Sequence, residues 1–170
     1  MWVFGYGSLI WGGWENSFDC RQRVSAELPG FRRAFNKPSV RNWGAKVFPC
    51  PTLNLVAEPD AMCTGVAFEF PEGRRSEVEA YLIDREGKHF VLNELTVTVN
   101  SQSLRASVAL YTGATLPPRS AIKMIAVMRH AKGTCGRCLD YVANVHAELA
   151  KIGIDDPIVT ELWKHLDAGR

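Results

Sequence analysis

The chain has 170 residues, of which 46% are hydrophobic and 22% are charged, and its formal net charge at pH 7 is +2. These values are typical of one globular domain with a hydrophobic core, so we expect a single domain over residues 1–170. A charge this small argues against nucleic acid or an acidic membrane surface as a partner. No apolar run approaches the roughly 20 residues of a membrane helix, and the N-terminal residues lack the features of a secretory signal. We therefore expect a cytoplasmic protein.

The first half of the chain is predicted to be rich in β-strands. The predicted strands are residues 2–4, 21–28, 32–36, 53–58 and 62–70. Turn residues are expected to separate neighbouring strands at Leu28-Pro29-Gly30 and at Glu58-Pro59-Asp60.

A short helix is predicted after these strands. Ser76 suits its N-cap, Glu79 completes a capping box, and Gly87 is placed to end the helix. Residues 95–99 then alternate between apolar and polar side chains, which predicts a strand, and residues 107–112 are its expected hairpin partner.

The last third of the chain is predicted to be helical. An apolar stripe runs along residues 139–152, and Gly153 is expected to end that helix. Asp156 and Pro157 start another helix, with Asp as the N-cap and Pro at the first helical position. Strands first and helices later, without regular alternation, predict an α+β fold.

The cysteines favour reduced thiols. They are Cys20, Cys50, Cys63, Cys135 and Cys138. An odd number without a secretory signal argues against a disulfide framework. The spacing of Cys135 and Cys138 admits a redox motif or half of a zinc site. A redox motif would lie near the start of a βαβ unit, however, and a zinc site would need two more ligands. We therefore expect no metal.

The loop after the first strand is a candidate anion site. Gly5 and Gly7 allow the backbone to bend sharply and leave its N–H groups uncovered. Uncovered N–H groups at a strand end can hold an anion or a developing oxyanion. Nucleotide-binding patterns are excluded, because no Lys follows the loop and Ile10 stands where a dinucleotide fingerprint needs its third Gly. A tight turn without a ligand is the alternative interpretation.

Glu86 is a candidate general acid/base. It is predicted at the C-terminal end of the short helix, where uncovered carbonyls disfavour a carboxylate and tend to raise its pKa. A carboxyl group with a raised pKa suits proton transfer near neutral pH. The alternative is a solvated Glu beside Arg85.

Other side chains also have two interpretations. Trp11, Trp14 and Trp43 lie near Gly-rich or polar segments, and they suit either a substrate site or the core. Arg32 and Arg41 suit either a contact with a substrate carboxylate or a solvated surface.

The loop and Glu86 lie in segments that resemble the motifs of a known family. Residues 3–11 (Val-Phe-Gly-Tyr-Gly-Ser-Leu-Ile-Trp) look like the glycine-loop motif of ChaC-type γ-glutamylcyclotransferases. Tyr81-Leu82 with Arg85-Glu86 looks like that family's Tyr-Leu-x-x-Arg-Glu stretch. Further similar segments follow in the family's order at residues 39–44, 51–53, 63–67 and 133–156. The resemblance therefore covers nearly the whole chain.

This resemblance implies a γ-glutamylcyclotransferase-like fold, which is a small β-barrel-like mixed sheet with flanking helices and a cavity at one side. It implies a lyase that degrades glutathione to 5-oxoproline and cysteinylglycine, with no cofactor and no metal. It gives the acid/base role to Glu86. It gives binding of the γ-glutamyl group to Tyr6, Gly7, Ser8 and Leu9, largely through backbone groups.

Departures from the family pattern keep two alternatives open. Phe90 stands where the family often has Tyr, which removes a possible hydrogen bond to the substrate. Cys135 and Cys138 replace a Ser and an Asn of the tail, and Ala45 replaces a polar residue. One alternative is cyclisation of another γ-glutamyl compound. The other is a non-catalytic regulatory protein that binds a small acid on the same fold, although Glu86 favours catalysis.

Overall fold

The computed structural model describes residues 1–167 and contains two compact units. Unit 1 comprises Met1–Arg33 and Leu55–Gly113. Unit 2 comprises Ala34–Asn54 and the described residues from Ala114 onward. The chain therefore enters unit 2 twice, and β2 and β3 each have residues in both units.

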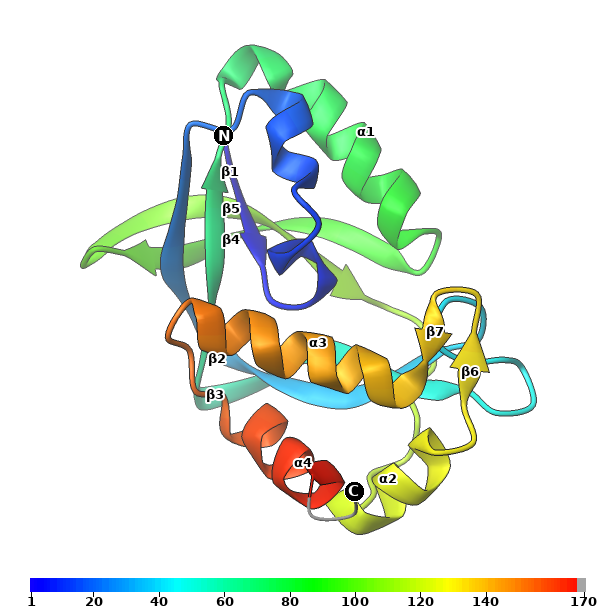
Figure 1. Cartoon of the computed structure of the whole chain (residues 1–170). Helices are drawn as coiled ribbons and strands as arrows, with labels where there is room; N and C mark the ends of the chain where they lie inside the picture. The colour runs from blue at the N-terminus through cyan, green and yellow to red at the C-terminus, as the bar shows by residue number, and fades with distance from the viewer. Residues whose placement is uncertain (168–170) are drawn as a thin grey trace. The chain divides into compact units, whose positions relative to one another are not determined.

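Five strands form a closed barrel in the order β1-β3-β2-β4-β5 (Figure 1). They are β1 (Trp2–Gly5), β2 (Gln22–Ser39), β3 (Cys50–Glu69), β4 (Phe90–Val99) and β5 (Gln102–Tyr111). β1 is antiparallel to β3 and parallel to β5, so the sheet is mixed. These strands and the helices described below confirm the predicted α+β fold with a small barrel-like mixed sheet.

The barrel in unit 1 encloses a cluster of buried apolar side chains. Its members are Phe4, Tyr6, Ala26, Leu28, Leu55, Cys63, Ala67, Val97, Val99, Ala106 and Val108. Val97 and Val99 belong to this cluster, which confirms the alternation predicted for residues 95–99. β4 joins β5 through a two-residue turn at Asn100 and Ser101, whose φ values of 47° and 64° suit the twist of a hairpin.

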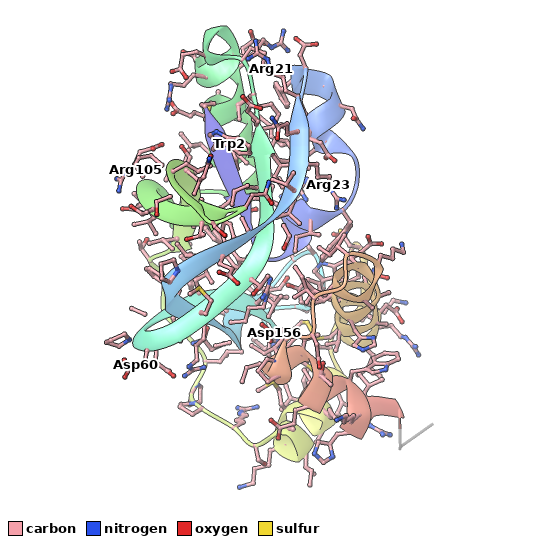
Figure 2. All side chains as sticks on the ribbon, turned by 90° about the vertical axis from the view of Figure 1, so that its left-hand side faces the viewer. Trp2, Arg21, Arg23, Asp60, Arg105 and Asp156 are labelled. Carbon is pink, nitrogen blue, oxygen red and sulfur yellow. A yellow bond between two sulfur atoms is a disulfide. The ribbon has the colours of Figure 1, made fainter. Side chains whose placement is uncertain are left out.

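β2 and β3 are longer than predicted, because the turns expected at Pro29-Gly30 and Pro59-Asp60 are wrong. Each strand continues through its proline. Gly30 has a φ of 78°, a left-handed conformation that Gly adopts without strain, so β2 passes through this position. Pro59 is exposed, and a strand tolerates the missing N–H at such a position. Asp60 lies where β3 bends (Figure 2).

The helix of the predicted acid/base is α1 (Arg75–Glu86), in unit 1. A 3-10 turn at Glu72–Arg74 precedes it and is spanned by an ion pair between Arg75 and Glu72. α1 therefore begins before Ser76, and the predicted N-cap is wrong. The predicted end is confirmed, because Gly87 follows the last helical residue and has a φ of 84°.

Unit 2 contains three helices and a short hairpin among its described residues. They are α2 (Ala121–Met128), β6 (Lys132–Gly133), β7 (Gly136–Arg137), α3 (Cys138–Lys151) and α4 (Pro157–Asp167). The predicted Asp156 cap is confirmed, because its Oδ1 accepts hydrogen bonds from the N–H groups of Ile158 and Val159 at 3.1 and 3.2 Å. α2 was not predicted. Within residues 1–167, no helix combines the length and apolar character needed to cross a membrane.

The expectation of reduced thiols is wrong for one pair of cysteines. Cys50 and Cys138 form a disulfide in unit 2. Cys50 is the first residue of β3 and Cys138 the first of α3, and the fold brings their Cα atoms to 5.4 Å, within the usual range for a disulfide. Their sequence separation of 88 explains why spacing did not reveal the pair. Cys135 is an exposed thiol, so Cys135 and Cys138 do not form the redox or zinc motif considered above.

Candidate functional site

The carbonyl groups of the loop after β1 are all occupied by donors within unit 1. The five oxygens from Tyr6 to Ile10 each accept a hydrogen bond, four of them from outside the loop and that of Gly7 from within it. In chain order the donors are Arg33 Nε (2.8 Å), the Ile10 N–H (2.9 Å), Arg85 Nη2 (2.9 Å), Trp14 Nε1 (2.9 Å) and Arg23 Nη2 (2.6 Å). The loop backbone is therefore held from its carbonyl side.

This arrangement determines where the N–H groups of the loop point. The N–H of a planar trans peptide points opposite to the carbonyl of the same peptide unit, and residues 1–167 contain no cis bond. The N–H groups of Gly7, Ser8 and Leu9 therefore point away from the donors that bind the carbonyls of their peptide units. Such N–H groups can bind an anion, as predicted for this loop.

Aromatic packing connects the loop to α1. Trp14, in the 3-10 segment η2 (Trp14–Phe18), is buried and stacks on Tyr81 of α1, with ring centroids 5.3 Å apart and an interplanar angle of 10°. Its ring also packs against Phe68 and Phe70 of unit 1 at 5.4 and 5.5 Å. Trp14 therefore belongs to the core, while its indole N–H holds the Leu9 carbonyl.

Glu86 is the last residue of α1, and its side chain is mostly buried, with 13% exposed. The Arg85 Nε lies 3.9 Å from Glu86 Oε1. The same guanidinium donates Nη1 to the Tyr81 hydroxyl and Nη2 to the Ser8 carbonyl, each at 2.9 Å. One side chain therefore contacts both the loop and the predicted acid/base, two features that were recognised separately in the sequence.

Phe90, which stands where the family often has Tyr, is the first residue of β4. Phe90 pairs with Tyr111 across the β4–β5 hairpin, and their ring centroids are 5.3 Å apart. A tyrosine is therefore present opposite Phe90, on the neighbouring strand. Arg32, one of the arginines considered for a substrate carboxylate, is paired with Glu58 on the surface of unit 1.

The arginines at the loop were missed by sequence reasoning. Arg33 is 1% exposed and therefore fully buried, although it directly follows Arg32, whose side chain is 40% exposed. Successive residues of a strand face opposite sides, so the Arg32-Arg33 pair within a predicted strand was a signal that one of the two is buried. Arg85 was noticed only as a neighbour of Glu86.

No candidate metal centre accompanies this site. Within the described part of the chain, no three His, Cys, Asp or Glu side chains are grouped so that they could hold a metal ion.

The fold of this chain is similar to that of solved cyclotransferases. The crystal structure of a yeast γ-glutamyl cyclotransferase specific to glutathione matches with a TM-score of 0.85 and 22% identity, covering 100% of this chain and 96% of that one. At this level of identity the match shows the fold.

Sequence relatives and a family model agree with that match. Gamma-glutamylcyclotransferase 2-3 of Arabidopsis thaliana is 30% identical over 95% of this chain and 86% of its own length. Gamma-glutamylcyclotransferase 2-1 of the same plant is 26% identical over 95% of this chain and 80% of its own length. The model of the family described as ChaC-like protein matches residues 1–168. From the extent of this match and the 30% identity to the first relative, we conclude that the chain belongs to the ChaC-like family.

Proposed function

We propose that this chain is a γ-glutamylcyclotransferase that cleaves glutathione to 5-oxoproline and cysteinylglycine. The names of its relatives and structural neighbours support this activity and substrate. The observation that carries the proposal is the Arg85 guanidinium, which contacts both the Ser8 carbonyl and the Glu86 carboxylate. A loop suited to an anion and a candidate acid/base thus meet at one point of unit 1.

The proposed reaction is intramolecular. The α-amine of the γ-glutamyl group attacks its own γ-amide carbonyl, a five-membered lactam forms, and the bond to the cysteine nitrogen breaks. Because nucleophile and electrophile are in one molecule, the enzyme has mainly to hold the cyclising conformer. This chemistry needs no nucleophile from the protein.

Glu86 carries the proton in this mechanism. A free α-amine has a pKa of roughly 8 and is mostly protonated at neutral pH, so it must lose a proton before it attacks. The Glu86 carboxylate accepts that proton and delivers it to the departing nitrogen of cysteinylglycine, while the second proton, which the attacking nitrogen loses as the lactam forms, is released to solvent. The same group therefore acts first as base and then as acid.

The loop holds charge on the substrate. The backbone N–H groups of Gly7, Ser8 and Leu9 suit the α-carboxylate of the γ-glutamyl group or the oxyanion that forms at its carbonyl. Tyr6 completes the proposed binding segment, and its own carbonyl is held by Arg33.

We infer that residues 1–170 form one γ-glutamylcyclotransferase-like domain, since a single family model spans residues 1–168. The compartment we propose is the cytoplasm, where glutathione keeps most thiols reduced, so the Cys50–Cys138 disulfide has to resist reduction there.

The decisive experiment compares Glu86→Gln with Asp84→Asn. Asp84 is an exposed carboxylate two residues earlier on the same helix, so its substitution is a matched control. The wild type and Asp84→Asn should release 5-oxoproline and cysteinylglycine from glutathione in equal amounts. Glu86→Gln should stay folded and lose activity by about 10²- to 10⁴-fold, the usual contribution of a general acid/base. Full activity in Glu86→Gln would show that another group transfers the proton.

A panel of substrates tests the rest of the proposal. Glutathione acetylated on its α-amine should be inert, because its nitrogen is no longer a nucleophile. Turnover of the acetylated compound would contradict intramolecular attack. If glutathione is inert and another γ-glutamyl peptide is cyclised, the mechanism holds and the substrate assignment is wrong.

A further inference from the structure

Two arginines from different elements act on the peptide groups of the loop. Arg33 of β2 donates Nε to the Tyr6 carbonyl at 2.8 Å, and Arg85 of α1 donates Nη2 to the Ser8 carbonyl at 2.9 Å. The peptide unit of Tyr6 carries the N–H of Gly7, and the peptide unit of Ser8 carries the N–H of Leu9. Each arginine therefore determines the direction of one N–H group of the loop.

The burial of Arg33 makes its contact informative. Arg33 is 1% exposed, and it is the largest of the fully buried residues in the described part of the chain. A buried guanidinium is costly unless it is hydrogen-bonded, so its place in the fold needs a compensating contact. A cation that donates to a carbonyl also polarises that peptide group, which strengthens the N–H on its opposite side as a donor.

Arg85 adds a link between the loop and Glu86. Its guanidinium contacts the Ser8 carbonyl, the Tyr81 hydroxyl and, at 3.9 Å, Glu86 Oε1. The planar guanidinium of Arg presents donors on three nitrogen atoms in fixed directions. The donors of Lys all lie on one nitrogen atom, which cannot contact these separate partners in the same geometry. Arg85 therefore connects Glu86 to the loop through a single side chain.

We propose that Arg85 and Arg33 are positioning residues, which direct the N–H groups of Leu9 and Gly7 toward the α-carboxylate of a γ-glutamyl substrate. This inference rests on the proposed function. The α-amine and the α-carboxylate share one carbon atom, so a carboxylate held by the loop keeps the amine close by. Arg85 then places Glu86 at the distance from which it can take the proton of that amine.

Binding without turnover tests this role most directly. In the Glu86→Gln background, glutathione should shift the amide NMR signals of Gly7 and Leu9. Adding Arg85→Ala should abolish the Leu9 shift and raise the dissociation constant for glutathione by about 10- to 100-fold, as expected when a hydrogen bond to a charged group is lost. The Gly7 shift should remain, because Arg33 is intact. A Gly7 signal that glutathione leaves unshifted in the Glu86→Gln protein would overturn the role given to Gly7 and Arg33, and this test needs no Arg33 variant.

Arg75→Ala is the matched control. Arg75 lies on the same helix and pairs with Glu72, Glu79 and Glu94, none of which belongs to the loop, so its loss removes the same charge. It should leave the dissociation constant within about twofold, a change of less than half a kcal/mol. Equal effects of Arg75→Ala and Arg85→Ala on binding would overturn the proposal.

Kinetics separate positioning from a simple charge effect on Glu86. With Glu86 present, Arg85→Ala should raise KM, and Arg85→Lys should restore less than half of the loss. A lower kcat with unchanged KM in Arg85→Ala would mean that Arg85 acts on Glu86 alone, and would overturn the proposal. A wild type that makes no 5-oxoproline would instead contradict the proposed function. In that case, titrating glutathione into the wild type decides the inference, because unshifted Gly7 and Leu9 signals overturn it and shifted signals support it.

Discussion

The loop at residues 6–10 in unit 1 and the segment at residues 41–42 in unit 2 are both held through their carbonyl groups, but by different donors. Four of the five donors to the loop are side chains, three of them arginines. The carbonyls of Arg41 and Asn42 instead accept from the backbone N–H groups of Thr134 and Cys135, at 2.9 and 2.7 Å. The loop is therefore held mainly by side chains, whereas residues 41–42 are held mainly by backbone N–H groups, with the Thr134 hydroxyl as an additional donor to the Arg41 carbonyl at 3.4 Å.

This difference matches the proposed distribution of roles. The residues proposed for catalysis and binding all lie in unit 1, where side chains hold the loop in one orientation. Unit 2 contains the disulfide and the hairpin β6–β7, and these constrain the backbone. Substitutions in unit 2 should therefore act first on stability, and substitutions at the loop first on substrate binding.

The largest effect expected in unit 2 is the loss of the disulfide. Cys50 and Cys138 close a loop of 88 residues, and Cys138→Ala should lower the free energy of unfolding by about 4–5 kcal/mol on the chain-entropy estimate. Urea unfolding with and without reductant measures this change. Hydrogen exchange should show the first loss of protection in α3 and in the hairpin β6–β7.

Cys135→Ala is the control for that substitution, because Cys135 is exposed and outside the disulfide. It should leave the unfolding midpoint and its response to reductant unchanged. An unfolding midpoint of the wild type that ignores reductant would contradict a stabilising role for the disulfide.

A smaller effect is expected from Gly133→Ala, which changes the backbone path at residues 41–42. A Cβ at Gly133 would lie 2.3 Å from the Arg41 carbonyl oxygen and 2.5 Å from the carbonyl of Asn42. Because both neighbours are backbone, the hairpin must move, and we expect a loss of about 2–3 kcal/mol in urea unfolding. Gly73→Ala is the control, because a Cβ there meets nothing within 4 Å. Equal stability of the two variants would show that the backbone at residues 41–42 can move aside for the new Cβ without a loss of stability.

The elements that could be predicted from the sequence depend on neighbours along the chain. Gly87 ends α1, Asp156 caps α4, and residues 95–99 alternate as a strand of the barrel. In each case the determining group lies within a few residues of the element that it ends, starts or shapes. The motifs around Tyr6 and Glu86 were likewise recognised as local patterns.

The contacts that could not be predicted join residues far apart in the chain. β2 continues through Pro29 because the barrel supplies a partner strand, which outweighs the local turn signal. The disulfide joins residues 88 positions apart. Arg85 reaches the Ser8 carbonyl across 77 positions, so the sequence contained the loop and Glu86 but not the guanidinium contact between them. The loop motif and the Glu86 motif could each be recognised in the sequence. Only the structure shows that Arg85 brings them together.

The smallest effect expected is a pH dependence confined to the surface of unit 1. The Arg75 guanidinium, and after it the N-terminal ammonium of Met1, both bind the Glu72 carboxylate and lower its pKa from its usual 4.5 to about 2. Because the pKa is lower in the folded state, these contacts stabilise the fold above pH 4.5 and cease to do so as the pH falls through about 2. Urea unfolding between these pH values should therefore weaken more steeply in the wild type than in Glu72→Gln. Glu77→Gln, which breaks a pair with Arg74 nearby, is the control.

The pair of Arg75 with Glu72 touches neither the loop nor unit 2. Glutathione turnover at neutral pH should therefore be the same in the wild type, Glu72→Gln and Glu77→Gln. A loss of turnover in Glu72→Gln would show that this part of the surface of unit 1 also holds the loop.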